Sequence, residues 1–312
     1  MIYYTGMYEN VCAARHFCGA MNRNAKKKGV GFMYRIVTKK ALTPTLILLE
    51  IEAPMIAKKA EPGQFIILRV DEDGERIPIT IHDFDREKGT VSIIFQIVGA
   101  TTEKLNRKQQ GEYIQDFVGP LGNATEMPGC KKVAVVGGGV GTAIAFPVAK
   151  KLHQQGVHVD LIVGFRNKDV VVLEDEFKNA CTNYFVGTDD GSYVRKALVT
   201  ELLEEQIQGG ANYDAVFCVG PMMMMKFVCK LTEKYNIPTV VSMSPIMVDG
   251  TGMCGGCRLT VGGETKFACV DGPDFDGFKV DWDEAVKRGK MYGAWERHKH
   301  EATCNLFKKE VK

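Results

Sequence analysis

The chain has 312 residues, of which 45% are hydrophobic and 25% are charged, and its formal net charge is +2. This composition is ordinary for a globular protein and gives no argument for nucleic-acid binding. No apolar run approaches the ~20 residues that span a bilayer, so we expect no membrane partner. The ten cysteines lie mostly in apolar segments, which fits reduced thiols and predicts a cytoplasmic protein.

Residues 1–32 differ from the rest of the chain. They lack a periodic apolar pattern and carry several basic residues, including the run Lys26 to Lys28, against the single acid Glu9. We expect a disordered extension, or a start codon placed too early with the true start at Met33. An organellar presequence is a further alternative.

From residue 33 to residue 129 the pattern is that of short β-strands. Runs rich in β-branched and aromatic residues are separated by turn residues such as Pro62-Gly63, and they predict an antiparallel barrel or sandwich. A short helix is expected over Thr102–Gln109. The expected strands are Leu46–Ile51, Gln64–Val70 and Thr90–Val98, and a further strand begins at Arg76.

From residue 130 to residue 243 strands alternate with helices, which predicts a doubly wound parallel sheet. The expected strands are Val133–Val136, Val157–Val163, Asn183–Val186, Ala215–Val219 and Thr239–Ser242. The expected helices are Gly141–Gln154, Val194–Ile207 and Met222–Tyr235. Residues 244–312 hold a cysteine cluster and a polar helical tail, and we treat them as a third segment.

A glycine-rich loop, V-V-G-G-G-V-G-T-A over Val135–Ala143, joins the first strand and first helix of this α/β part. Such a loop brings backbone N–H groups at a helix N-terminus close to a phosphate. It is not the usual NAD fingerprint, because Thr142 replaces the third glycine and Arg166 follows the second strand in place of an acid. Arg166 has two interpretations, a ligand of a 2′-phosphate or a solvated loop cation.

Cys218 ends a later strand and is followed by Gly220 and Pro221, which open a helix. Ligands of such sheets bind at the carboxyl ends of the strands. The thiol could therefore face a nicotinamide ring, or it could be a buried structural cysteine.

The segment from Asp249 to Cys269 is the most informative, and it reads D-G-T-G-M-C-G-G-C-R-L-T-V-G-G-E-T-K-F-A-C. Cys254 and Cys257 form a C-x2-C pair, and Asp249 stands where plant-type iron–sulfur spacing places its first cysteine. A [2Fe–2S] cluster is the favoured interpretation. Structural zinc and unrelated buried thiols remain open on spacing alone.

Together these motifs resemble the ferredoxin-reductase superfamily, in which a β-barrel for FAD precedes an α/β domain for a nicotinamide cofactor. With the cysteine segment added, the chain resembles the electron-transfer subunits of dihydroorotate dehydrogenase. It resembles more closely the small subunits of the NADH-dependent reduced ferredoxin:NADP oxidoreductase type, which have an aspartate where this chain has Asp249.

The resemblance implies site residues position by position. Flavin contacts are implied at Arg76, Pro78, Ile79, Thr80, Val98, Gly99, Thr101, Thr102, Gly119, Pro120, Leu121 and Gly122. Nicotinamide-cofactor contacts are expected at Gly137, Gly138, Gly139, Gly141, Thr142, Arg166, Asp189, Asp190, Cys218, Gly220 and Pro221. Thr80 and Cys218 are the expected catalytic contacts, and Asp249, Cys254, Cys257 and Cys269 the implied cluster ligands. The arginine lies one residue farther from the hydroxyl than in the usual R-x-Y-S/T motif, and Pro78 replaces the aromatic residue.

The implied function is hydride exchange between NAD(P)H and FAD, with single electrons relayed through the cluster. The implied partner is a larger, amidotransferase-like FAD and iron–sulfur flavoprotein, through which ferredoxin is reached. NAD(H) is the expected nicotinamide, with NADP(H) left open. The alternatives are the electron-transfer subunit of dihydroorotate dehydrogenase and, in another class, a zinc-stabilised binding protein without redox activity.

Overall fold

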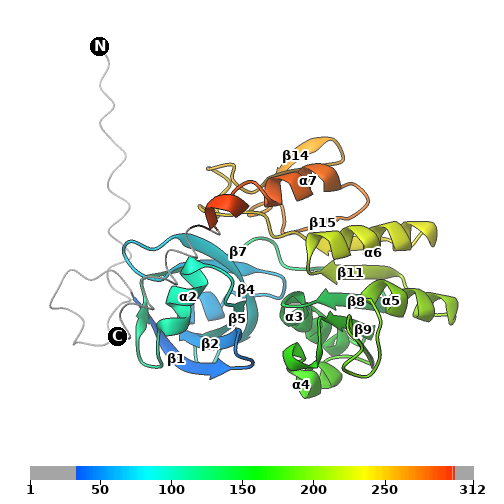
Figure 1. Ribbon diagram of the computed structural model, residues 1–312, viewed down its shortest axis with the longest axis horizontal. Helices are drawn as coiled ribbons and strands as arrows, with labels where there is room; N and C mark the ends of the chain where they lie inside the picture. The colour runs from blue at the N-terminus through cyan, green and yellow to red at the C-terminus, as the bar shows by residue number, and fades with distance from the viewer. Residues whose placement is uncertain (1–32, 297, 299–312) are drawn as a thin grey trace, which may run out of the picture. The chain divides into compact units, whose positions relative to one another are not determined.

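The computed structural model describes residues 33–296 and 298, and the predicted extension 1–32 lies outside them. The described chain forms a seven-stranded sheet, a six-stranded sheet and a two-stranded hairpin (Figure 1). Within these residues, no helix has the length and apolarity needed to cross a membrane.

The first sheet is an antiparallel barrel with the strand order β6-β1-β2-β5-β4-β3-β7. Alternate side chains such as Ile36, Leu49, Ile66 and Ile93 fill its interior and are fully buried, as the period of two in a pleated strand requires. The predicted barrel is confirmed. Its strands are β1 (Tyr34–Ala41), β2 (Leu46–Glu52), β3 (Phe65–Arg69), β4 (Arg76–Asp85), β5 (Thr90–Gln96), β6 (Tyr113–Ile114) and β7 (Asp116–Leu121), with α1 (Pro54–Ala57) and α2 (Ala100–Arg107) between them.

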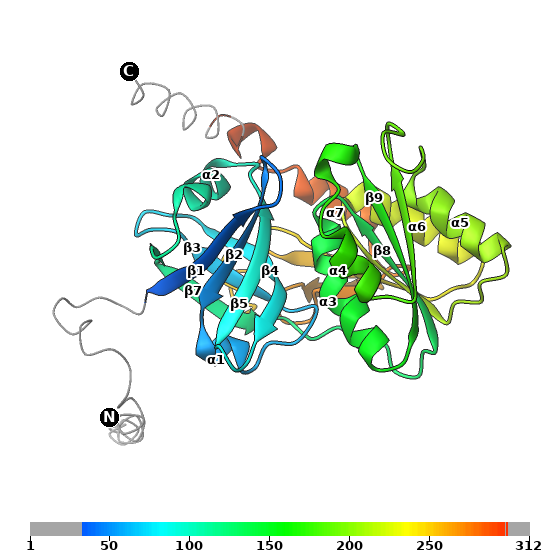
Figure 2. The same cartoon turned by 90° about the horizontal axis from the view of Figure 1, so that it is seen from below.

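The second sheet has the order β10-β9-β8-β11-β12-β15, and all strands but the last are parallel. Helices α3 and α4 cover one face and α5 and α6 the other (Figure 2), which confirms the doubly wound sheet. Its strands are β8 (Lys132–Gly138), β9 (His158–Phe165), β10 (Asn183–Thr188), β11 (Ala215–Val219), β12 (Thr239–Ser242) and β15 (Asp274–Asp276). The helices are α3 (Gly141–Gln154), η2 (Lys168–Val170), α4 (Glu174–Asn179), α5 (Val199–Gln208) and α6 (Met222–Lys234).

The C-terminal segment is tied to this sheet. It contains the hairpin β13 (Arg258–Val261) and β14 (Glu264–Phe267), then β15 and α7 (Trp282–Gly289). Strand β15 pairs with β12 in antiparallel register, with Phe275 opposite Val241, and Met243 N donates to Pro273 O at 2.8 Å. The sequence did not indicate this strand, because three residues carry too short a pattern.

Two predicted helix boundaries were wrong. The helix expected from Val194 begins at Val199, because Val194 has a φ of 54° and Lys196 forms a parallel bridge with Thr188. The helix expected over Thr102–Gln109 is α2, which begins at Ala100, because the Thr102 hydroxyl accepts from the backbone N–H of Gly99 at 3.0 Å and stabilises an earlier start.

Strand β4 of the barrel packs directly against α3. His82 Nδ1 donates to Ala143 O at 2.8 Å, and its ring stacks on Phe146 with the centroids 5.0 Å apart. Burial lowers the pKa of His82, so the ring is neutral at pH 7. Lys150 pairs with Asp83 at 3.0 Å beside this contact. The strand that carries Pro78 and Thr80 is thereby fixed against the helix that follows the glycine loop.

Candidate functional site

A narrow slot lies where the barrel, the α/β sheet and the C-terminal segment meet. Its walls are mainly apolar, with hydroxyl groups from Thr80, Ser242 and Ser244 among them, as is usual for a cofactor pocket. The slot has a volume of about 30 Å³, roughly that of one water molecule, so a ring system enters only if its walls separate. The lining residues are Phe65, Pro78, Thr80, Ile144, Val219, Ser242, Met243, Ser244, Met247 and Pro273.

The slot contains only two of the residues expected to contact the flavin, Pro78 and Thr80. Ile79 alternates to the other face of β4 and packs in the barrel core. Phe65, Met247 and the other lining residues were not predicted, because apolar residues in ordinary strands and loops carry no chemical signal.

Two threonine hydroxyls shape the turn before α2. The Thr102 hydroxyl accepts from the backbone N–H groups of Val98 and Gly99, at 3.0 Å each, and so closes the turn before the helix. The Thr101 hydroxyl donates to Glu75 at 2.9 Å. No heavy atom lies within 4 Å of the position a Cβ of Gly99 would take. A phosphate can therefore approach the helix N-terminus closely.

The glycine loop before α3 combines packing with open space. A Cβ on Gly141 would lie 2.5 Å from Val219 O, and one on Gly220 would lie 3.0 Å from Gly138 O. These glycines let the β8–α3 turn and the β11–α6 turn touch. Gly139 differs, because it has a φ of 56° and nothing within 4 Å of its Cβ position. It is the position in the loop where a phosphate has room.

Cys218 is the last residue but one of β11 and is fully buried, and burial raises the pKa of its thiol well above the usual value. Its side chain packs on the face covered by α5 and α6, with Met225 and Val228. The next residue, Val219, points to the opposite face and lines the slot. Pro221 directly precedes α6.

Arg166 and the two aspartates after β10 lie at the carboxyl ends of adjacent strands. Thr188 pairs with Phe165 in register, and the backbone N–H of Asp189 donates to Phe165 O at 3.0 Å. The Asp190 carboxylate accepts from Ser192 Oγ at 2.6 Å, and this hydrogen bond lowers the pKa of Asp190. The structure thus brings together three residues expected near the nicotinamide cofactor.

The four implied cluster ligands fall into two groups. Cys257 and Cys269 are buried with their sulfurs 3.3 Å apart, while Cys254 is exposed and its sulfur accepts from Gly256 N at 3.5 Å. That hydrogen bond lowers the pKa of the Cys254 thiol. The Asp249 carboxylate accepts from the N–H groups of Thr251 and Met253, at 3.0 and 3.3 Å.

This donor set fits an iron–sulfur centre. Two thiolates on one tetrahedral metal with bonds of about 2.3 Å are ~3.8 Å apart, close to the Cys257–Cys269 spacing. Backbone N–H groups directed at sulfur are a feature that tunes such centres. Among residues 33–296 and 298, no three acidic, cysteine or histidine side chains are already grouped for a metal, so Asp249 and Cys254 have to turn toward the buried pair.

The loop that carries Asp249 is seated on the barrel. Gly250 has a φ of 87°, and its Cβ position is 2.8 Å from both Ile67 Cδ1 and Leu121 Cδ1. Only glycine allows this approach. Farther along, Asn123 N donates to Gly272 O at 2.7 Å. The predicted flavin loop Gly119–Gly122, which ends β7, therefore lies against the cluster segment.

Comparisons with known proteins agree with this geometry. Residues 244–281 match the family model of the iron–sulfur cluster binding domain of dihydroorotate dehydrogenase B. A Thermotoga maritima protein named as a homolog of that enzyme's electron transfer subunit is 44% identical over 251 residues, covering 80% of this chain and 88% of its own. The dihydroorotate dehydrogenase B electron transfer subunit of Desulforamulus reducens is 31% identical over 250 residues. The match covers 78% of this chain and 95% of the Desulforamulus reducens protein.

The chain belongs to the dihydroorotate dehydrogenase B electron-transfer subunit family. An uncharacterized Clostridium beijerinckii protein is 51% identical over 268 residues, covering 83% of this chain and 90% of its own. A chain in the solved structure of NADH-dependent reduced ferredoxin-NADP oxidoreductase is 41% identical, with a TM-score of 0.82, and the match covers 90% of this chain and 99% of that one.

Membership of this electron-transfer subunit family confirms three predictions. The chain is a ferredoxin-reductase-like oxidoreductase subunit, its fold is that of the superfamily, and its expected cofactors are FAD, NAD(H) and an iron–sulfur cluster. The family does not support the alternative of a zinc-stabilised binding protein. The family's members are named as electron-transfer subunits, that is, as parts of larger enzymes.

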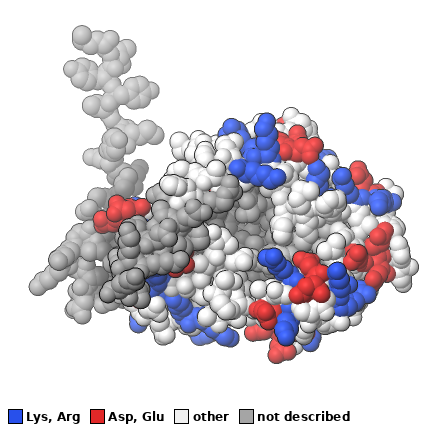
Figure 3. Space-filling model, viewed as in Figure 1, with Lys and Arg blue, Asp and Glu red and all other residues white. Residues whose placement is uncertain are grey.

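Exposed apolar side chains surround the cluster ligands. Ile246, Val248, Met253 and Val270 are all exposed, and Met253 is 88% exposed. We call these four residues the cluster-side patch. On the face drawn in Figure 3, basic and acidic side chains are interspersed among uncharged ones, without a large area of one sign. The cluster-side patch is thus defined by four exposed apolar side chains.

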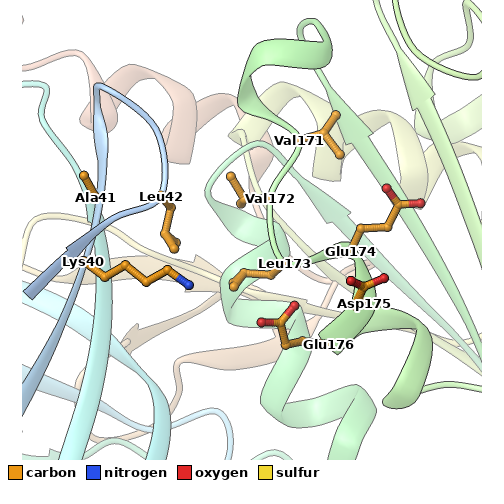
Figure 4. A pocket seen from close by; sticks show the side chains of 9 residues that line it. All are labelled: Lys40, Ala41, Leu42, Val171, Val172, Leu173, Glu174, Asp175 and Glu176. Carbon is orange, nitrogen blue, oxygen red and sulfur yellow. The ribbon is translucent and has the colours of Figure 1, made fainter. Parts of the chain in front are cut away.

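A larger cavity of about 370 Å³ lies apart from the slot. It is formed by the β1–β2 turn and residues 171–176, and Figure 4 shows Lys40 and Leu42 on one side and Leu173 and Glu176 on the other. It contains none of the residues expected to bind a cofactor. Leu42 and Leu173 also pack on a small buried cluster around Ile94, so this region joins the barrel to the α/β part.

Proposed function

We propose that the chain exchanges electrons between a nicotinamide cofactor, bound FAD and a [2Fe–2S] cluster, and passes them to or from a larger flavoprotein of the ferredoxin:NADP oxidoreductase type. One observation carries the proposal: a single slot is lined by β4 of the barrel, the carboxyl ends of β11 and β12, and the segment that holds the cluster ligands. The proposed flavin, nicotinamide and cluster sites would therefore lie close to one another around this slot.

The flavin would lie with its ring in this slot and its pyrophosphate at the start of α2. Pro78 and Thr80 line the slot, and the Thr80 hydroxyl would hydrogen-bond to the ring. Val98, Gly99, Thr101 and Thr102 shape the anion site at the helix N-terminus.

The nicotinamide cofactor would lie along the carboxyl ends of the α/β strands. Gly139 leaves room for its pyrophosphate, while Gly138, Gly141 and Gly220 keep the two neighbouring turns in contact. Arg166, Asp189 and Asp190 follow the ends of adjacent strands, and they would contact its adenosine end. Val219 faces the slot directly, and Cys218 supports the strand from behind.

Asp249, Cys254, Cys257 and Cys269 would hold the cluster. When bound, the flavin and the nicotinamide exchange a hydride, and the cluster transfers single electrons. The protein would position these groups, and the apolar side chains of Phe65, Met247 and Pro273 would limit the access of water to a ring bound in the slot. We propose that residues 33–129 form the FAD domain, residues 130–243 the nicotinamide domain and residues 244–312 the cluster segment.

The second candidate is the electron-transfer subunit of a dihydroorotate-oxidising enzyme. The match of residues 244–281 to that enzyme's cluster domain favours it. The aspartate in the first ligand position and the 41% identity to a chain of the ferredoxin-NADP oxidoreductase structure favour the first proposal. The larger subunit that copurifies with the chain distinguishes the two.

Anaerobic purification tests the proposal. We expect about one FAD and about two irons per chain, and NADH-dependent reduction of an artificial dye. The isolated chain should fail to couple NADH, NADP and ferredoxin, because it contains no further redox domain of its own in the described residues. Stoichiometric zinc without iron, or ferredoxin-linked activity from a monomeric chain alone, would overturn it.

A further inference from the structure

Arg76 lies at the start of β4, four residues before Thr80, and its side chain turns away from the slot. The guanidinium Nε donates to Val248 O at 2.7 Å, and Nη2 donates to Asp249 O at 3.4 Å. Its third nitrogen, Nη1, lies 4.0 Å from Asp116 Oδ2. All three nitrogens therefore face groups of the protein, and two of them hold carbonyls of the loop that carries the first implied cluster ligand.

The loop is held from two sides. Gly250 packs on Ile67 and Leu121 with no room for a side chain, which fixes the loop against β3 and β7. Arg76 holds the preceding residues from β4. A planar guanidinium makes two hydrogen bonds in a fixed fork, so it restricts the direction of both carbonyls as well as their distance.

We propose that Arg76 is a positioning residue for the iron–sulfur centre, not a ligand of the flavin pyrophosphate. It holds the backbone of Val248 and Asp249 so that the Asp249 side chain can reach the Cys257–Cys269 pair, and it adds a positive charge beside that centre. The inference rests on the proposed function, because it assigns a role toward the cluster.

The charge and the hydrogen bonds act in defined directions. A reduced cluster carries one more negative charge than an oxidised one, so a nearby cation stabilises the reduced state and raises the reduction potential. Groups that orient metal ligands from behind change metal affinity by about 10- to 100-fold when they are removed. Arg76 should therefore affect both the potential of the cluster and its retention.

The same strand serves both cofactors. Thr80 lines the slot and Arg76 contacts the cluster loop, and four residues of extended strand separate them by roughly 14 Å. β4 is fixed along this length by its pairing with β3. A single rigid strand thus sets the distance between the flavin wall and the first implied cluster ligand.

The test compares Arg76→Gln, Arg76→Lys and Arg69→Gln in the full-length chain with its cofactors. Arg69 is the matched control, because its Nε also pairs with Asp116, at 2.6 Å, but it donates to Glu72 O and not to the cluster loop. The measurements are iron and FAD per chain, the rate of iron loss to a chelator, the electron paramagnetic resonance spectrum and midpoint potential of the cluster, and hydrogen exchange of residues 246–253.

We expect Arg76→Gln to lower the midpoint potential, to release iron on the order of tenfold faster and to increase exchange in the loop, with FAD content unchanged. Arg76→Lys should leave the midpoint potential close to that of the wild type but should still release iron faster. It preserves the positive charge but not the two parallel hydrogen bonds of the guanidinium. Arg69→Gln should resemble the wild type.

Loss of FAD from Arg76→Gln with an unchanged cluster would overturn the inference, because Arg76 would then be a ligand of the flavin pyrophosphate. Equal effects from Arg69→Gln would also overturn it, because the Asp116 neighbourhood would then be the cause. If the wild-type chain contains iron and the Arg76 variants match it in every measurement, this inference is refuted but the proposed function is not. A wild-type chain without iron refutes the proposed function as well.

Discussion

The Thr125 hydroxyl donates a hydrogen bond to Asp274 Oδ2 at 2.5 Å and so joins the connection between the two large sheets to strand β15. The Asp274 carboxyl is almost completely buried, its Oδ1 atom has no hydrogen-bond partner, and burial raises its pKa to about 6. Hydrogen bonds from Thr125 and Ser242 lower the pKa of Asp274, but they do not offset the increase that burial causes.

This carboxyl makes stability depend on pH. In the unfolded chain it titrates near 3.8 and in the folded chain near 6, so between these values the folded state binds more protons. The free energy of unfolding therefore falls as the pH rises through this window, by about 3 kcal/mol in total. Asp274→Asn removes the charge, and we expect it to stabilise the chain by about 1–3 kcal/mol at pH 7, with roughly half of that gain left at pH 5.

The apparent Tm measured between pH 5 and pH 8 checks this expectation. Thr125→Val is the companion variant, because it removes a hydrogen bond that lowers the pKa of Asp274 and should destabilise the chain at pH 7. An Asp274→Asn chain that is less stable than the wild type at pH 7 and 8 would show that the ionised carboxylate is stabilising.

Asp249 is the second point to test by substitution. We expect Asp249→Ala to make the cluster labile and Asp249→Cys to retain it with a shifted potential, because the identity of a ligand tunes such centres. Iron content and the midpoint potential measure both effects. Thr251→Ala is the control, since it removes the hydroxyl bonded to Asp249 and leaves the carboxylate. An unchanged spectrum and potential in Asp249→Ala would require another fourth ligand.

The architecture was largely predictable from sequence. Strands such as β11 and β12 were predicted with their exact bounds, because short runs rich in β-branched and apolar residues between turn residues favour buried strands. The helix start at Val199 was missed, because a left-handed residue at Val194 and a bridge at Lys196 are decided by tertiary contact. Strand β15 was missed because three residues carry too short a pattern, and its place is set by pairing with β12.

The site was predictable only where the side chains carry chemistry. The cysteines and the glycine loop stand out by type and spacing. The direction of a side chain cannot be read from residue type and spacing. The sequence therefore did not indicate that Val219, rather than Cys218, faces the slot. Nor could it show that Arg76 reaches across to a loop 172 residues away in the chain. Such contacts depend on how separate segments pack.

Nucleotide preference is the third expectation. Arg166 lies beside Asp189 at adjacent strand ends, and the aspartate would repel a 2′-phosphate that the arginine attracts. We expect NADH to be preferred, Arg166→Ala to leave NADH kinetics nearly unchanged, and Asp189→Asn to raise kcat/KM for NADPH several-fold. Steady-state kinetics with both nucleotides measure this. A strong NADPH preference that Arg166→Ala abolishes would reverse the assignment.

The cluster-side patch supplies the last expectation. Large exposed apolar side chains around a redox centre mark a surface that another protein covers, and an electron-transfer subunit needs its cluster close to the acceptor. Met253, which is 88% exposed and precedes Cys254, is the most prominent of them.

Met253→Lys places a charge that loses its water if the larger subunit covers it, so we expect about tenfold weaker association with that subunit. Met55→Lys is the matched control, because Met55 is 74% exposed on α1 of the barrel and is not one of the patch residues. Size-exclusion chromatography of the coexpressed subunits and a titration of the purified pair measure the affinity, and the resonance spectrum of the cluster verifies that the centre is intact. Equal affinity in Met253→Lys and Met55→Lys, with an intact cluster in both, would place the partner on another face of the molecule.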